Sequence, residues 1–231
     1  MLRTLVITSC TGEKYVKSEN QLIQEDFRDP SRLHNREIEL CHSRKPAAEM
    51  YAGWQHRCLM EGIYKLRSNF KDEVFDVGII SAGYGLVSEE RLIVPYEVTF
   101  NKMSNREIIA WSRFLNIHND LEELIKSYDL VFFLLGEKYL RAIELPLKNV
   151  DESKRLIFLA SKKYRPPAVE SYSFFEVGKK EAIAFGYGLV GLKGYLFKLI
   201  SKELVSNGIE LVERIKEEPE VLLIILEKYK K

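Results

Sequence analysis

Small residues, lysines and tyrosines recur directly after four apolar segments of the chain. The apolar segments are residues 2–8, 74–80, 129–135 and 155–160. The residues that follow them are Ser9-Cys10-Thr11-Gly12-Glu13-Lys14-Tyr15, Ser81-Ala82-Gly83-Tyr84-Gly85, Gly136-Glu137-Lys138-Tyr139 and Ser161-Lys162-Lys163-Tyr164. Glycine lets backbone N–H groups approach a ligand closely, lysine supplies positive charge, and a tyrosine ring offers a flat face on which a base stacks. Together these residue types favour a nucleobase or nucleotide as the ligand.

The four apolar segments are expected to be strands, and helical patterns separate them. These patterns cover residues 46–70, 104–111, 119–126 and 138–145. Ser104 and Glu107 have the spacing of a capping box, which predicts where the second of these helices begins. Strands that alternate with helices predict an α/β fold, with a mostly parallel sheet flanked by helices. Ligands of such sheets bind beyond the carboxyl ends of the strands.

The last part of the chain has a helical pattern from residue 176 onward, with breaks at 186–194, 207–208 and 219. We therefore expect an α/β domain over residues 1–175 and a helical C-terminal extension over residues 176–231. The extension is expected to pack on the same domain, because no low-complexity linker precedes it.

Lys14 and Cys10 are the candidate catalytic residues. Lys14 could contact an anion or a base, or act as a nucleophile; it could equally be a solvated loop lysine. Cys10 lies where a helix N-terminus could stabilise a thiolate, or it could simply fill the end of a strand.

The candidate ligand-binding residues follow a predicted strand or the turn at Pro95. They are Ser9, Thr11, Gly12, Ser81, Tyr84, Gly85, Tyr96, Glu97, Gly136, Lys138 and Tyr139. Tyr84 and Tyr96 could stack a base or pack together as a lid. Glu97 could accept a guanine-type pair of N–H groups or be solvated. Under the alternative interpretation of the whole set, the Lys-Tyr pairs begin surface helices and the tyrosines only pack.

The composition argues against several other classes of protein. The net charge is +1, so no global positive field indicates nucleic-acid binding. No apolar run is long enough to span a bilayer, and the N-terminus does not resemble a signal peptide, so we expect a cytoplasmic protein without a membrane partner. The cysteines Cys10, Cys41 and Cys58 do not predict a disulfide framework. His42 and His56 lie near two of them without the spacing of a zinc site, so no metal or other cofactor is expected.

Three motifs resemble those of the YaaA-like superfamily. The first is Ile80-Ser81-Ala82-Gly83-Tyr84-Gly85-Leu86 followed by Pro95-Tyr96, the second is Thr8-Ser9-Cys10-Thr11-Gly12-Glu13-Lys14, and the third is Leu134-Leu135-Gly136-Glu137-Lys138-Tyr139. The resemblance covers roughly residues 3 to 145. It implies work on nucleic acid or a modified base. The superfamily includes a peroxide-stress protein associated with DNA binding, relatives in the archaeosine synthase group that act on a deazaguanine base in tRNA, and proteins of a DNA deazaguanine-modification system.

The resemblance also bears on individual residues. In the synthase group, the loop that matches Cys10 to Lys14 lies near the chemistry, which points to Lys14. Peroxide-stress members carry a helix-hairpin-helix that contacts the DNA backbone. The nearest candidate here is residues 188–194, where Lys193 stands in place of a glycine that the hairpin needs.

The sequence therefore predicts a protein that recognises a nucleobase, a nucleotide or nucleic acid, either DNA or tRNA. If it is an enzyme, the expected activity is that of a nucleobase-modifying transferase or hydrolase acting on a deazaguanine-type base. Two alternatives stay open: a non-catalytic DNA-binding protein of the oxidative-stress response, and a small-nucleotide sensor. The sequence does not determine the oligomeric state.

Overall fold

The computed structural model describes residues 2–16, 19–71, 73–148 and 150–231. Its centre is a six-stranded sheet with the strand order β4-β3-β1-β6-β7-β8. The strands are β1 (Arg3–Ser9), β3 (Val74–Ser81), β4 (Gly85–Ser88), β6 (Leu130–Phe133), β7 (Arg155–Ala160) and β8 (Tyr172–Glu176). All neighbouring pairs are parallel except β3 and β4. The expected α/β fold with a mostly parallel sheet is confirmed. A separate antiparallel pair joins β2 (Lys45–Pro46) to β5 (Leu92–Ile93).

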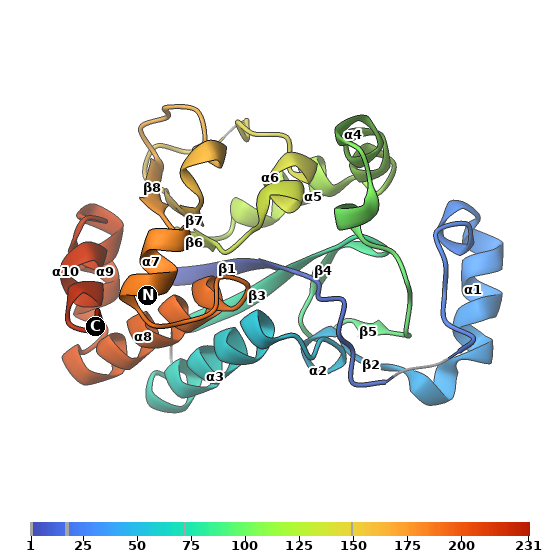
Figure 1. Cartoon of the computed structure of the whole chain (residues 1–231), viewed down its shortest axis with the longest axis horizontal. Coiled ribbons are helices and arrows are strands. Elements are labelled where there is room, and N and C mark those ends of the chain that lie inside the picture. Colours follow the sequence, from blue (N-terminus) through green and yellow to red (C-terminus); the bar gives the residue numbers. More distant parts are fainter. Residues whose placement is uncertain (1, 17–18, 72, 149) are drawn as a thin grey trace.

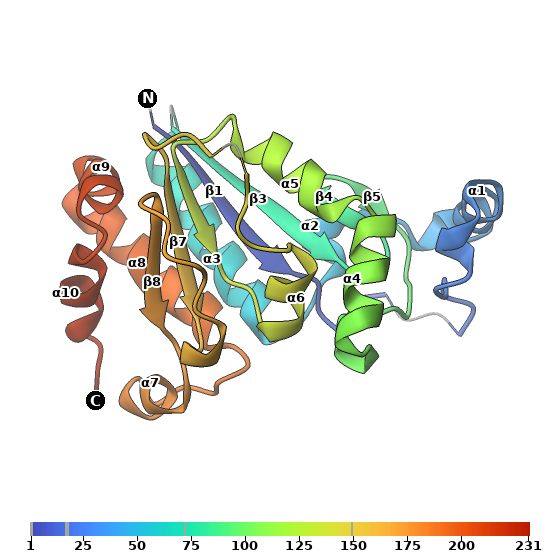
Figure 2. The ribbon, with the colours of Figure 1, turned by 90° about the horizontal axis from the view of Figure 1, so that it is seen from above.

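Helices cover both faces of this sheet, as Figure 1 shows. One face carries α3 (Trp54–Asn69) and α8 (Leu192–Asn207), and the other carries α4 (Asn105–Phe114), α5 (Ile117–Ile125) and α6 (Glu137–Ala142). The remaining helices are α1 (Pro30–Glu39), α2 (Ala47–Met50), α7 (Lys179–Ala184), α9 (Glu210–Glu217) and α10 (Val221–Glu227). Figure 2 shows α1 projecting beyond one side of the molecule, with α9 and α10 at the opposite side.

The chain leaves β1 and β6 in opposite directions, although these strands are neighbours. From β1 it continues through α3 to β3, and from β6 it continues through α6 to β7. The loops that follow β1 and β6 therefore separate and leave a crevice at the carboxyl edge, which is the usual ligand position in open α/β sheets.

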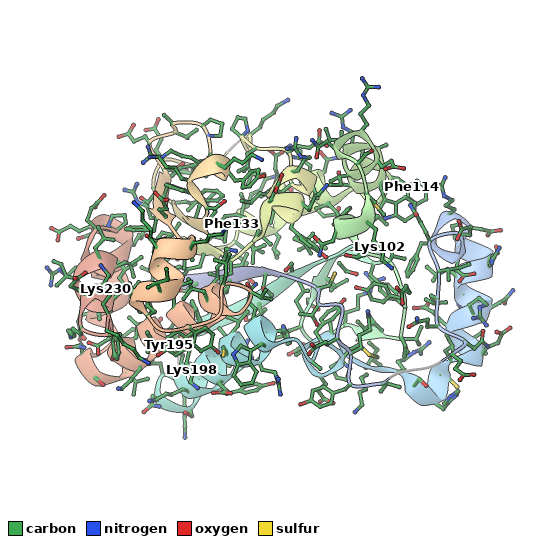
Figure 3. The ribbon with its side chains drawn as sticks, in the orientation of Figure 1. Lys102, Phe114, Phe133, Tyr195, Lys198 and Lys230 are labelled. Carbon is green, nitrogen blue, oxygen red and sulfur yellow. The ribbon has the colours of Figure 1, made fainter. Side chains whose placement is uncertain are left out.

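Aromatic residues of β6 pack on both faces of the sheet. Successive side chains of a strand point to opposite sides of the sheet. Phe132 accordingly packs edge-on against Phe197 of α8, with ring centroids 5.5 Å apart, while Phe133 stacks on Phe158 of β7 at 4.5 Å. Phe133 lies in the interior of the molecule (Figure 3). The buried residues of α8 thus belong to the same hydrophobic core as the sheet.

Several elements differ from the sequence-based expectation. The predicted helix over 46–70 is interrupted after α2, because the backbone of residues 50–52 bonds to residues 13–15 instead of continuing the helix. Strand β4 was not predicted, and neither was β8, which ends where the helical extension was expected to begin. The capping box of Ser104 and Glu107 is confirmed at the start of α4.

Within the described residues, no helix is long and apolar enough to cross a membrane.

The first turns of α3 and α8 approach so closely that glycine is required. A Cβ atom on Gly194 would lie 2.1 Å from the carbonyl oxygen of Gln55. We expect Gly194→Ala to lower the free energy of unfolding by about 1–3 kcal/mol, even though alanine favours a helix by about 1 kcal/mol. Urea unfolding measures this change. Gly188→Ala is the matched control, because a Cβ atom there meets nothing within 4 Å; equal effects of the two substitutions would contradict the packing argument.

Candidate functional site

A cavity of about 710 Å³ opens at the carboxyl edge of the sheet, where the loops after β1 and β6 separate. The first turn of α3 and the segment that enters α8 complete its walls. Its lining residues are Ser9, Cys10, Thr11, Gly12, Glu13, Gly53, Trp54, Gln55, Asn101, Gly136, Glu137, Lys138, Tyr139, Leu189, Val190 and Lys193. Both its position and its size are typical of a small-molecule site in an α/β protein.

The structure brings together the candidate residues that follow β1 and β6. Those lining the cavity are Ser9, Cys10, Thr11, Gly12, Gly136, Lys138 and Tyr139. A Cβ atom on Gly12 or Gly136 would contact nothing within 4 Å, so these two glycines face open space. Their roles in binding stay predictions, but their proximity follows from the neighbouring positions of β1 and β6 in the sheet.

Cys10 and Tyr139 meet at the buried base of this cavity. The Cys10 sulfur lies 3.1 Å from the Tyr139 hydroxyl, and both side chains are less than a tenth exposed. Burial raises the pKa of Tyr139 well above its usual range, so its hydroxyl stays neutral and can either donate or accept a hydrogen bond. A thiol and a phenol from two different strand ends are thus in direct contact beneath the cavity.

The candidate residues that follow β3 do not line the cavity. Tyr96 is 1% exposed, and its hydroxyl lies 2.8 Å from both the Ser81 hydroxyl and the Tyr51 hydroxyl. Ser81 in turn accepts hydrogen bonds from the backbone N–H groups of Gly83 and Tyr84. Tyr96 is therefore not a lid over the cavity; it is part of a buried hydroxyl cluster that holds the turn after β3.

Tyr84 and Gly85 do not line the cavity either; both have structural roles in the turn after β3. The Tyr84 hydroxyl donates to Glu37 of α1 at 3.0 Å, and its ring packs edge-on against Phe27 at 5.0 Å. Gly85 has a φ of +74° at the start of β4, a conformation that glycine adopts without steric cost. Tyr84 thus anchors the projecting segment that carries α1, and Gly85 makes the hairpin possible.

Lys14 lies behind the cavity and does not line it. Its Nζ atom is 4.2 Å from the centroid of the Tyr96 ring, a cation–π contact. Burial lowers the pKa of Lys14, while Cys10 and Glu97 act in the opposite direction. Glu97 is exposed and pairs with Lys102 at 3.0 Å, which lowers the pKa of Glu97.

The cavity has further polar and aromatic residues that strand-end reasoning missed. Trp54 is 53% exposed at the start of α3. Gln55 donates from its side chain to the carbonyl of Leu134 at 2.9 Å, which ties α3 to the end of β6. Lys193 comes from the first turn of α8, more than 50 residues after Gly136 in sequence.

Lys193 is the cation of the cavity whose charge is least compensated. Burial lowers its pKa, and among the described residues no side chain forms a hydrogen bond or ion pair with its ammonium group. Lys138, by contrast, donates to the carbonyl of Met103 at 2.8 Å. Residues 188–194, which the sequence analysis compared with a DNA-binding hairpin, thus include the part of the cavity wall that carries Lys193.

The residues that follow β7 belong to a different cavity. Lys163 and Tyr164 line a volume of about 410 Å³ together with Arg141. Helix α6 lies between the ends of β6 and β7 and separates the two cavities. Among the described residues, only Glu137 in the first turn of α6 lines both of them. The four similar strand ends therefore do not form a single rim.

In the comparisons with known proteins, a family model matches part of the chain. The model of a family of unknown function, DUF6884, matches residues 41–152. None of the curated proteins matches the chain significantly. The matched segment includes the walls of the cavity from α3 and α6, but neither the loop after β1 with Cys10 nor the first turn of α8 with Lys193.

The partly buried charge of Lys14 leads to a prediction for stability against pH. Because its pKa is lower in the folded protein, the folded state binds fewer protons than the unfolded chain as the pH approaches 10.5. The stability of the wild type relative to Lys14→Met should therefore rise between pH 7 and pH 10.5. Urea unfolding of both proteins across this range measures the difference.

Lys198 provides a control of opposite sign. Its pKa is raised by a hydrogen bond to Glu61, so its contribution is fully present below the unfolded pKa and is lost only as the pH rises through the higher folded pKa. The difference between wild type and Lys198→Met should stay constant from pH 7 until about pH 10. A Lys14→Met difference that is equally constant would contradict the assigned burial.

Proposed function

We propose that the protein recognises a nucleotide, holding its base and phosphate in the cavity between β1 and β6. The observation that carries this proposal is a partly buried lysine, Lys193, without a hydrogen-bond or ion-pair partner among the described residues, in the same cavity as the exposed Trp54 and at the position where α/β sheets bind ligands. Partial burial of an ammonium group without an ion-pair partner is costly. Glu13 and Glu137 also line the cavity, but among the described residues neither pairs with Lys193, so the phosphate of a ligand would supply the missing partner.

The base and the phosphate have separate partners in this proposal. Lys193 takes the phosphate through a charge-assisted hydrogen bond. Trp54 stacks the base, and Ser9, Thr11 and Asn101 offer hydroxyl and amide groups for its edge. The cationic and aromatic groups come from helices on one face of the sheet, whereas most of the hydrogen-bonding groups come from strand-end loops.

The resemblance to the YaaA-like superfamily extends this proposal to a deazaguanine-type base in tRNA or DNA. A base at the end of a polynucleotide, or one flipped out of a duplex, enters a cavity as a free nucleotide does. We keep the cytoplasmic location within the proposal, because Cys10, Cys41 and Cys58 are unpaired.

Titration with a nucleoside monophosphate and the matching nucleoside tests the proposal. We expect GMP or AMP to raise the melting temperature, with a stabilisation of about 2.7 kcal/mol at a hundredfold excess over Kd. Lys193→Met should weaken nucleotide binding roughly 10- to 100-fold, the value of a charged hydrogen bond, and leave nucleoside binding nearly unchanged. Trp54→Phe should abolish the ligand-induced change in fluorescence, because Trp111 is buried and donates to the carbonyl of Ala82.

Lys198→Met is the matched control on the same helix. Lys198 pairs with Glu61 on the outer side of the α3–α8 layer (Figure 3) and should have no effect on binding. Equal losses in Lys193→Met and Lys198→Met, or no stabilisation by any nucleotide, would refute the nucleotide site. Duplex DNA binding with a steep salt dependence that Lys193→Met leaves unchanged would favour the DNA-binding alternative.

Cys10 offers a second measurement of the same site. In alkylation by iodoacetamide, the thiol sulfur bonds to the methylene carbon of the reagent. Iodide leaves, and the thiol proton passes to the buffer. Because Cys10 lines the cavity, saturating nucleotide should slow its alkylation at least several-fold, as peptide mass spectrometry would measure. Cys41 is exposed and serves as the internal control; its rate should not change. Protection of both cysteines or of neither would argue against ligand binding above Cys10.

A further inference from the structure

The loop after β7 borders a cavity that the proposed nucleotide site does not use. Its volume is about 410 Å³, and it lies on the other side of α6 from the first cavity. Three cations line it: Arg141 in the last turn of α6, and Lys163 and Arg165 in the loop after β7. Cations from two segments of the chain thus face the same space.

Arg141 has no anionic partner in the described part of the chain. Its side chain is half-buried, and its Nε atom is buried without a hydrogen bond to any described residue, although buried donors are usually satisfied. Nε is the one nitrogen of this guanidinium that is both buried and unbonded. None of the described residues accepts a hydrogen bond from Nη1 or Nη2, so these two atoms are accessible. A ligand can therefore reach the terminal nitrogens of Arg141.

Lys163 and Arg165 also lack carboxylate partners among the described residues. The Lys163 ammonium lies over the Tyr164 ring at 5.3 Å, and the Arg165 guanidinium lies over the Phe174 ring at 5.1 Å. A hydrogen bond to Tyr164 raises the pKa of Lys163, while the charge of Arg141 acts in the opposite direction. Lys163 and Arg141 are therefore close enough to repel each other, and neither charge is neutralised by an ion pair.

The two carboxylates of this cavity leave an excess of positive charge. Glu144 is held by Arg113, which lies outside the cavity, with 2.6 Å between the guanidinium nitrogen and the carboxylate oxygen. Glu137 lines the cavity on the side of α6 that also borders the first cavity, and it forms no ion pair with a described residue. Three uncompensated cations and one uncompensated carboxylate give an excess of two positive charges, which favours a dianion over a monoanion.

We propose that this cavity binds a phosphate group, which accepts hydrogen bonds from the Nη atoms of Arg141 and from the ammonium group of Lys163. A guanidinium can donate to two oxygens of one phosphate in its own plane. The charge of a phosphate monoester is about −1.5 to −2 at pH 7, which matches the excess in the cavity. Tyr164, Leu145 and Pro167 supply apolar surface for the group that carries the phosphate.

This site does not depend on nucleotide recognition in the first cavity. To keep the two apart, each protein in the test carries Lys193→Met, which removes the unpaired cation of the first cavity. Calorimetric titration with phenyl phosphate at constant ionic strength should show saturable binding. Lys163→Met should weaken it roughly 3- to 10-fold, the value of one hydrogen bond, and Arg141→Met roughly 10- to 100-fold, the value of a charged one.

Lys162→Met is the matched control. Lys162 is the neighbour of Lys163 and is equally exposed, but it does not line the cavity. Removing either lysine changes the net charge by the same amount, so a difference between the two variants measures the cavity and not the overall field. Because both lysines are exposed, both variants should fold like the parent protein. Equal losses in Lys162→Met and Lys163→Met would overturn the proposal.

A second probe distinguishes the two sources of a phosphate. Trithymidylate without terminal phosphates contains only backbone diesters. Binding of phenyl phosphate alone, weakened by Lys163→Met, would assign the site to a small phosphate ester. Binding of trithymidylate that Lys163→Met weakens would assign it to the backbone of a polynucleotide. If neither probe binds, the proposal fails. Binding that depends on Lys163 would stand even if the nucleotide titration of the first cavity gave no stabilisation.

Discussion

The first turns of α3 and α8 leave no room for a side chain between them, and the arrangement of the cavity depends on this contact. Gly194 lies directly on the carbonyl of Gln55. The Gln55 side chain bonds to the end of β6, so the same residue joins α8, α3 and the sheet. Lys193 and Trp54 flank this contact in sequence and therefore reach the carboxyl edge together. A lysine from the C-terminal helices thereby becomes part of a cavity whose base is formed by Cys10 and Tyr139, which follow β1 and β6.

A buried hydroxyl cluster forms the second fixed part of the site. The hydroxyls of Tyr51, Tyr96 and Ser81 are linked by hydrogen bonds, and burial raises the pKa of both tyrosines. They consequently stay neutral and can hydrogen-bond to one another without carrying a charge into the core. None of these three side chains lines the cavity between β1 and β6, so the cluster stabilises the turn after β3 without contacting the proposed ligand. The Tyr51 ring also lines a separate cavity of about 440 Å³.

Local sequence predicts those parts of the structure that depend on strands and their immediate ends. Cys10 and Tyr139 were found because each follows a strand, and β1 and β6 are neighbours in the sheet. Lys193 could not be found in this way, since its position depends on a helix contact between residues that are distant in sequence. Strand β8 was missed because its short segment owes its extended form to pairing with β7.

The tyrosines after β3 show a different limit. A glycine-flanked tyrosine after a strand is equally suited to stacking on a ligand and to packing in the protein interior. For Tyr84, contacts with Glu37 and Phe27 show that the ring packs within the protein. Both partners come from the segment that contains α1. The irregular sequence of residues 10–45 is compatible with either a functional loop or short helices. Its contribution to the core could therefore not be derived from the strand-end pattern.

The distribution of charge favours recognition at short range. A chain with a net charge of +1 has no overall field that would attract nucleic acid from a distance. Most of the close cation–carboxylate pairs among the described residues lie on the surface, where they are screened and contribute little. Lys193, in contrast, is partly buried and has no such partner among the described residues, so its attraction for an anion is less screened but confined to the cavity. A ligand must enter before it experiences this charge, which fits a nucleotide or an extruded base better than the outside of a duplex.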